Sequence, residues 1–416
     1  MKKLVIISLI LLSLSALMAI KTGKSIFYAD SYMLRAQGVE AAYWNPANLV
    51  AGKYYDLWLP GANTGVYVQN NALDLDTYNF VMSRDKLSDT DKELILNKLD
   101  GSLRGSFSGN TSIFGYAFSN MSISSSLNYM GSFSLSEQYL DILLHGNTED
   151  QYKFDKHLND ISALSYADIT FGIGGFNIPF LPETMPPIRF GMSGSVLAGV
   201  GSAHTERYDG YLRSSIDSGI SMHQDIDIRT AMGGQGFKGM IGFASNPMPN
   251  LEVGLTLDNI LGAINWNMYT KDQKYHFEAD SVYVSNLEDN FYSQTSAEEE
   301  VESFSTSLPP ELRMGVLWTS PKLSLSSDYV QGFEESMVTS SIGKLSFGAR
   351  VLPVYFLPLS FGISLGNSKS PFRASYGISF KSETAEIGVG FQSFDSLIPG
   401  TKSKGVSFGS MLRLWY

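Results

Sequence analysis

Residues 372–392 read FRASYGISFKSETAEIGVGFQ, and this stretch decides the fold class. Apolar side chains occupy every second position from Phe372 to Phe380, and again from Ala385 to Phe391, with small or polar residues between them. Such alternation predicts strands with one apolar and one polar face, because successive side chains of a strand point to opposite sides. The short polar break at 382–384 joins the two runs, so the stretch predicts an antiparallel hairpin.

The same alternation recurs along the chain, most clearly after residue 236. The predicted strands are 54–68, 105–118, 121–134, 162–176, 187–201 and 236–244, followed by eight that start near Leu251, Leu312, Leu323, Ile342, Leu357, Phe372, Ala385 and Gly405. The first is interrupted by Pro60 and Gly61, and residues 208–229 are assigned to extensions of loop-side strands. Fourteen is an even number, which puts both ends of a barrel chain on the periplasmic side.

A soluble β-sandwich would also alternate, but three observations favour a transmembrane antiparallel β-barrel. Short turns near 246–250, 320–322, 352–356 and 382–384 alternate with longer connections at 259–310, 331–341, 367–371 and 395–404, the asymmetry of outer-membrane barrels. The apolar face from Phe372 to Phe380 spans roughly 26 Å of strand, or about 20 Å of membrane after tilt. Finally, the last predicted strand ends on the aromatic residue Tyr416.

Composition narrows the function classes. Charged residues make up 17% of the 416 residues, below the roughly 25% that is typical of soluble proteins. The formal net charge of −11 argues against a nucleic-acid-binding surface, which needs a basic stripe. The chain has no cysteine, which excludes disulfides, thiolate catalysis and a lipidated cysteine anchor.

The N-terminus predicts export. Lys2 and Lys3 precede an apolar run from Leu4 to Leu14 and a small-residue exit that ends at Ala19, the pattern of a secretory signal peptide. We therefore expect a signal peptide at 1–19, an N-terminal segment at 20–53 and an outer-membrane barrel at 54–416.

Two helices are expected in the outside loops. Thr90 with Glu93 reads as a capping box that opens a helix over 90–99, and Ser134 with Glu137 reads as the start of another that closes at Gly146. Both are amphipathic, so we expect them to pack over the barrel mouth.

The N-terminal segment carries a resemblance. Residues 35–49, RAQGVEAAYWNPANL, resemble the opening of FadL and PorV-type outer-membrane proteins, which runs into a Trp-Asn-Pro-Ala-like motif. Residues 236–260, with a Pro-containing turn at 246–250 and an Asn-Ile pair at the end, resemble the central hairpin of that superfamily. The spacing along the chain is similar to a less characterised, PorV-related branch.

The resemblance implies a fourteen-stranded barrel whose N-terminal segment folds into the lumen as a hatch. Asn45, Pro46 and Ala47 would then be hatch residues, and a conformational change there would open a path for hydrophobic compounds. The residues are compatible with this, since Pro46 holds Asn45 extended and Asn45 can bond backbone groups. The alternative is an ordinary Asn-Pro turn leading into the first strand.

Charged residues on the polar faces of the strands are expected to face the lumen. They are Glu252, Asp258, Arg313, Lys344, Arg350, Arg373, Lys381, Glu386 and Arg413. They are interpreted either as a selectivity lining or as mixed-sign pairs that fill the interior, and the second interpretation is favoured.

No other constellation predicts chemistry. The acidic pairs at 74/76, 89/91 and 225/227 lack the rest of a calcium loop, and the five histidines are scattered over predicted outside loops without cysteine partners or a nucleophile motif. The glycine clusters at 172–175 and 233–236 do not open helices and predict tight points of a sheet. No enzyme activity, metal or cofactor is expected.

The leading hypothesis is an outer-membrane barrel that passes or binds hydrophobic small molecules, with no nucleic-acid partner. The alternative is a PorV-like barrel that docks partner proteins for secretion or surface attachment through its acidic loops. A soluble secreted sandwich or adhesin is the third hypothesis. The barrel is expected to be monomeric and surrounded by outer-membrane lipid.

Overall fold

The computed structural model describes residues 20–49, 55–84, 86–147, 151–179, 182, 184–215, 219–282, 292–367 and 370–416. The predicted signal peptide at 1–19 lies outside the described residues, as do residues 50–54 at the predicted boundary of the barrel. Within this part of the chain, no helix is long and apolar enough to cross a membrane.

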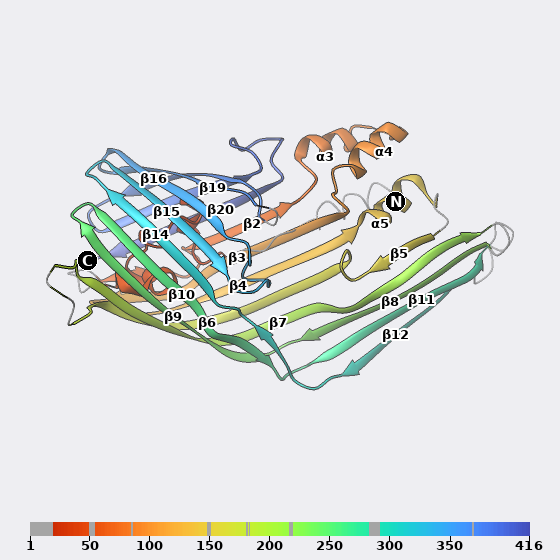
Figure 1. Ribbon diagram of the computed structural model, residues 1–416, viewed down its shortest axis with the longest axis horizontal. Helices are drawn as coiled ribbons and strands as arrows, with labels where there is room; N and C mark the ends of the chain where they lie inside the picture. The colour runs from red at the N-terminus through yellow and green to blue at the C-terminus, as the bar shows by residue number, and fades with distance from the viewer. Residues whose placement is uncertain are drawn as a thin grey trace.

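The strands form one antiparallel sheet that closes on itself (Figure 1). Its closed wall has fourteen strand positions in the described chain, as the alternation predicts. The wall is made of β1 (Asp56–Trp58) with β2 (Thr64–Asn70), β3 (Ser102–Phe118), β4 (Met121–Ser136), β6 (Asp160–Asn177), β7 (Ile188–Ser215), β9 (Gly234–Met248), β10 (Leu251–Trp266), β13 (Phe304–Ser307) with β14 (Glu311–Thr319), β15 (Leu323–Gly332), β16 (Lys344–Val354), β17 (Leu357–Ser364), β18 (Arg373–Lys381), β19 (Ala385–Phe394) and β20 (Gly405–Trp415).

Closure is made where the first strands meet the last. β2 pairs with β3 on one side and with β20 on the other, with Thr64 opposite both Thr111 and Ser410. The interruption at Pro60 and Gly61 divides this wall position into β1 and β2, because proline cannot donate to a strand ladder.

The outer surface of the wall is apolar. Phe380, Ile387 and Phe391 are each more than half exposed, whereas their sequence neighbours Ser379, Glu386 and Gln392 are buried. Similar apolar side chains stand exposed on the other wall strands. A continuous belt of this kind would be a large aggregation-prone patch in water, but lipid solvates it. The fold is therefore a transmembrane barrel, and the hypothesis of a soluble sandwich is wrong.

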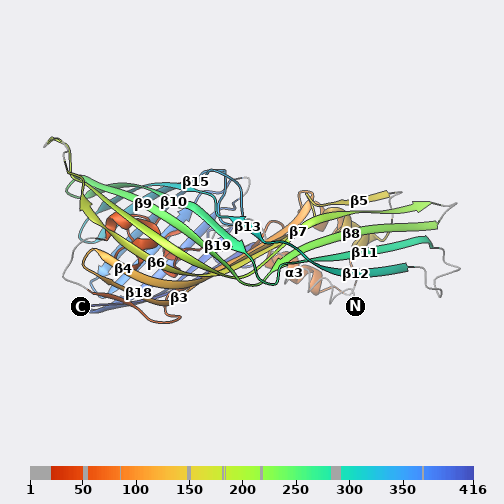
Figure 2. The ribbon, with the colours of Figure 1, turned by 90° about the horizontal axis from the view of Figure 1, so that it is seen from below.

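The two ends of the barrel differ. Tight connections at 119–120, 249–250, 320–322, 355–356 and 382–384 lie at one end, here the turn end. At the other, the loop end, β7 continues past the wall over its 28 residues. There it pairs with β5 (Gln151–Asp155) and β8 (Gly219–Ala231), and β8 is followed by β11 (Lys271–Val282) and β12 (Tyr292–Glu300). This outer sheet, β5-β7-β8-β11-β12, projects far beyond the barrel (Figures 1 and 2).

In the described part of the chain, three helices lie at the loop end: α3 (Leu75–Met82), α4 (Asp89–Leu96) and α5 (Glu137–His145). Helix α3 was not predicted from the sequence; Asp74 caps it by accepting a hydrogen bond from the Thr77 amide. Both predicted helix starts were wrong. The capping box of α4 is Ser88 with Asp91 rather than Thr90 with Glu93, and α5 follows Ser136, since Ser134 still pairs within β4.

Candidate functional site

The chain before β1 lies inside the barrel. Residues 20–49, here called the inner segment, form η1 (Gly23–Tyr28), η2 (Gly38–Glu40), α2 (Ala41–Trp44) and η3 (Pro46–Asn48), and nearly all of their side chains are buried. The segment is drawn in red and is surrounded by wall strands in both views (Figures 1 and 2). Short helical turns suit this place, because they satisfy most of their own backbone hydrogen bonds inside a closed wall.

Glycines of the wall let the inner segment approach closely. A Cβ atom at Gly174 would lie 1.8 Å from the Pro46 carbonyl oxygen, and one at Gly191 would lie 2.4 Å from the same oxygen. On the opposite wall, a Cβ at Gly362 would lie 2.2 Å from the Tyr28 carbonyl carbon. Any larger residue at these positions would collide with backbone, so the glycine-rich alternation of the strands matches the shape of the inner segment.

The predicted hatch residues lie where the inner segment meets β6, β7 and β9. The Asn45 side chain caps η3 by accepting a hydrogen bond from the Ala47 amide at 3.1 Å. Its Nδ2 donates to the Phe243 carbonyl of β9 at 3.2 Å. Pro46 occupies the first position of η3, where its missing N–H is not needed. These bonds fix the motif against the wall.

Asp30 of the inner segment forms ion pairs with cationic side chains from separate wall strands. Its carboxylate lies 3.1 Å from Lys344 Nζ on β16 and 3.2 Å from Arg373 Nη1 on β18. Arg313 of β14 donates to the Asp30 carbonyl at 3.2 Å and stacks on the Trp44 ring, 4.7 Å from its centroid. Three predicted lumen-facing residues thus converge on one turn of the inner segment.

Two further ion-pair groups hold the other side of the segment. Lys21 Nζ forms ion pairs with Asp258 Oδ2 at 2.6 Å and with Glu311 Oε1 at 3.2 Å. Lys24 Nζ meets Glu386 at 3.4 Å, and Glu386 also accepts from Arg350 at 2.9 Å. Opposite charges from the segment and the wall are therefore matched at several separate points.

The remaining predicted residues lie away from these pairs. Glu252 forms an ion pair with Arg189 near the turn end. Arg413 Nε donates a hydrogen bond to the Asp56 carboxylate at 3.0 Å. The same carboxylate accepts a hydrogen bond from the Val39 amide at 2.9 Å. Lys381 stands over the Tyr355 ring, 5.2 Å from its centroid.

A cavity of about 50 Å³ lies between the inner segment and the wall. Its floor is charged, with Lys21, Asp258 and Glu311 among the lining residues, and its sides include Tyr166 and Leu308. A buried apolar cluster continues from these sides toward the loop end; its members include Met130, Leu164, Leu197, Ile264 and Trp266. The inner segment therefore fills much of the interior next to this cavity, with nearly all of its side chains buried.

A separate apolar pocket lies beside the loop end, between α3, α4, α5 and the start of β3. The lining is almost wholly hydrophobic: Leu73, Thr77, Tyr78, Val81, Leu87, Ile95, Leu99, Leu103, Leu140, Leu143 and Leu144. Two amphipathic helices were predicted here, but a pocket between them was not. The pocket depends on the unpredicted helix α3, which supplies Thr77, Tyr78 and Val81.

Histidines that are scattered in the sequence meet on the outer sheet. β8 and β11 pair so that His276 lies opposite Asp225, and the rings of His223 and His276 have centroids 5.1 Å apart. Strand register thus brings together two histidines that are 53 positions apart in the sequence, a proximity that their spacing along the chain did not indicate.

No family model and no curated protein matches the chain in sequence. Among solved structures, the chain is similar to a FadL homologue of Pseudomonas aeruginosa, with 11% identity, coverage of 96% of this chain and 99% of that chain, and a TM-score of 0.50. It also matches the toluene transporter TbuX of Ralstonia pickettii (10% identity, 91% and 93% coverage, TM-score 0.48). A third match is the toluene transporter TodX of P. putida (11% identity, 97% coverage of both chains, TM-score 0.47).

The chain has a closed wall, an N-terminal segment inside it, and structural similarity to the FadL homologue over nearly its whole length. It therefore has the fold of a FadL-type outer-membrane β-barrel.

Proposed function

We propose that this barrel sits in the bacterial outer membrane, with its loop end outward, and passes hydrophobic small molecules across it. The observation that carries the proposal is the apolar pocket at the loop end. Its lining contains no charged side chain among the described residues, so it suits a ligand without charge or hydrogen-bonding groups. A ligand held there would lie directly against the outer side of the loop end.

The inner segment supplies the second part of the proposal, a hatch. Because the inner segment lies within the barrel, passage would require it to shift, and the Asn45-Pro46-Ala47 motif is the contact that must yield. It touches the wall through the Asn45 side-chain bond to Phe243 and through the Pro46 carbonyl against Gly174 and Gly191.

A charge in the pocket tests the proposal. Leu140→Lys puts an ammonium group into the apolar lining, whereas Leu94→Lys, on a side chain that is 49% exposed outside the pocket, is the matched control. We expect uptake of radiolabelled toluene and of a long-chain fatty acid by cells to fall severalfold for Leu140→Lys only. Equal uptake of every tracer by the two variants, at equal amounts of barrel in the membrane, would refute the capture role of the pocket.

A variant of the motif tests the hatch. Asn45→Ala removes both the cap of η3 and the bond to Phe243, and we expect it to change the uptake of hydrophobic tracers. Unchanged uptake across several tracers contradicts a hatch at this motif. The docking of a secreted or surface protein stays a prediction from the sequence resemblance.

A further inference from the structure

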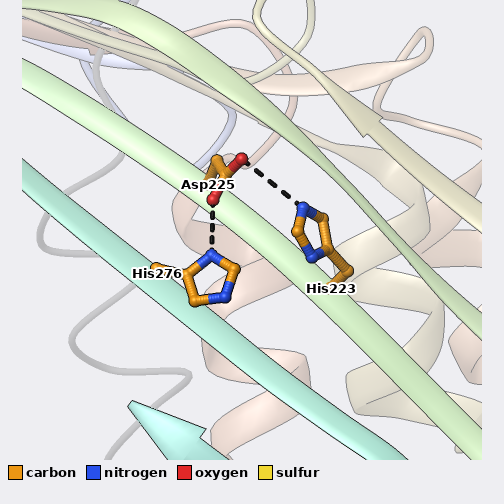
Figure 3. Close-up of side chains that lie close together, drawn as sticks. All are labelled: His223, Asp225 and His276. Carbon is orange, nitrogen blue, oxygen red and sulfur yellow. Dashed lines mark hydrogen bonds and ion pairs between the residues drawn. The ribbon is translucent and has the colours of Figure 1, made fainter. Parts of the chain in front are cut away.

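The face of the outer sheet that continues from the barrel interior carries a group of imidazoles and carboxylates. His223 and Asp225 are two residues apart on β8, so both point to the same face. His276 of β11 is the direct cross-strand neighbour of Asp225, and such neighbours have side chains in contact. Figure 3 shows the two rings turned toward the one carboxylate between them.

The distances fit a single ion. His276 Nδ1 lies 2.7 Å from Asp225 Oδ1, and His223 Nε2 lies 3.4 Å from Asp225 Oδ2. One ligand atom from each of the three residues lies within 4.8 Å of the other two. Ligands at about 2.1 Å from a tetrahedral ion are about 3.4 Å apart, so shifts of about 1 Å in the ligand atoms would bring all three to one centre.

Neighbouring groups hold the rings in place. Glu278 lies 3.7 Å from His276 Nε2, the ring nitrogen that faces away from Asp225. A carboxylate on the outer nitrogen of a histidine is the arrangement that orients metal-binding imidazoles. His223 stacks on Tyr211, with centroids 5.9 Å apart and ring planes 22° apart.

One cation competes for the carboxylate. Arg207 Nη2 lies 2.6 Å from Asp225 Oδ2 and 3.6 Å from Asp209. Because Asp209 is well exposed and close, Arg207 can move to it when a divalent ion takes Asp225. The group therefore has a built-in place for the displaced guanidinium.

We propose that His223, Asp225 and His276 form a binding site for a divalent transition-metal ion, with Zn²⁺ or Cu²⁺ as the ions that best suit this ligand set. Two imidazoles and one carboxylate match the ligand preference of these ions and leave a coordination position open to water. The site is on the outer sheet beyond the closed wall (Figure 1), and its three residues are partly exposed, so it can take up an ion from the medium.

Zn²⁺ titration of the full-length barrel in detergent, free of affinity tags, tests the site. We expect one Zn²⁺ per chain in the wild-type protein, measured by competition with a chromophoric chelator. His276→Gln should lower the affinity by about tenfold or more. The matched control is His157→Gln, which changes an exposed histidine outside the cluster and should leave the affinity unchanged.

Cu²⁺ electron paramagnetic resonance separates loss of a ligand from loss of folding. The wild-type spectrum should show coupling to two imidazole nitrogens, and that of His276→Gln to one, while far-UV circular dichroism stays the same. Absence of stoichiometric Zn²⁺ binding by the wild-type protein, or equal affinity in His276→Gln and His157→Gln, overturns the proposal. Neither outcome bears on the uptake of hydrophobic tracers, which tests the proposed function.

Discussion

The contact between Pro46 and β7 can be tested by adding a single methyl group. In Gly191→Ala the new Cβ would lie 2.4 Å from both the carbonyl carbon and the oxygen of Pro46, where 3.4 Å is the start of ordinary contact. The inner segment or β7 must therefore move by about 1 Å, and overpacking of this kind costs about 1–3 kcal/mol. Because the obstacle is backbone, no side-chain rotation can relieve it.

Two assays measure the consequence. We expect Gly191→Ala to lower the free energy of unfolding by about 1–3 kcal/mol in urea titrations of the barrel in lipid vesicles. We also expect a higher rate of osmotic swelling of vesicles in a small hydrophilic solute, since a displaced inner segment seals the lumen less well. Gly201→Ala is the control on the same strand, because the nearest atom to its Cβ would be 3.8 Å away. If the two variants unfold and leak alike, the close seating of Pro46 on the wall is not what closes the lumen.

Two further perturbations follow from charges. Asp30→Asn removes the carboxylate that lies 3.1 Å from Lys344, whose side chain is only 2% exposed; we expect a loss of about 3 kcal/mol in the same urea titration, and a wild-type midpoint would contradict the pairing. At the loop end, the Ser88 amide donates to Asp91 and holds the pKa of that carboxyl below its usual value of 3.8. A lowered folded-state pKa means that the stabilisation of α4 is complete above about pH 4 and is lost as the pH falls through the lowered value. Hydrogen exchange of the α4 amides, corrected for intrinsic rates, should show this loss below pH 4 in the wild-type protein and not in Asp91→Asn.

The wall was predictable because its signal is local and repeated. From Phe372 to Phe380 one face of the strand contacts lipid and is apolar, while the other faces the lumen and is small or polar. The polarity of the residues therefore alternates with a period of two along the whole strand. The same holds from Leu251 to Asp258, and pairing of β10 with both β9 and β14 follows from the order of the strands. Helix starts were less predictable, since Ser88 and Thr90 offer equivalent capping side chains and only the surrounding loop selects one of them.

The contacts of the inner segment were not predictable, because they depend on where a long, irregular stretch lies in a closed wall. Nothing near Asp30 in the sequence indicates that Lys344 and Arg373 are its partners. The outer sheet shows the same limit: the pairing of His276 with Asp225 depends on the register of two hairpins, and a shift by one residue would turn every histidine to the opposite face. Alternation therefore specifies a barrel, whereas what the barrel holds, inside and beyond the membrane, is decided by pairings between distant residues.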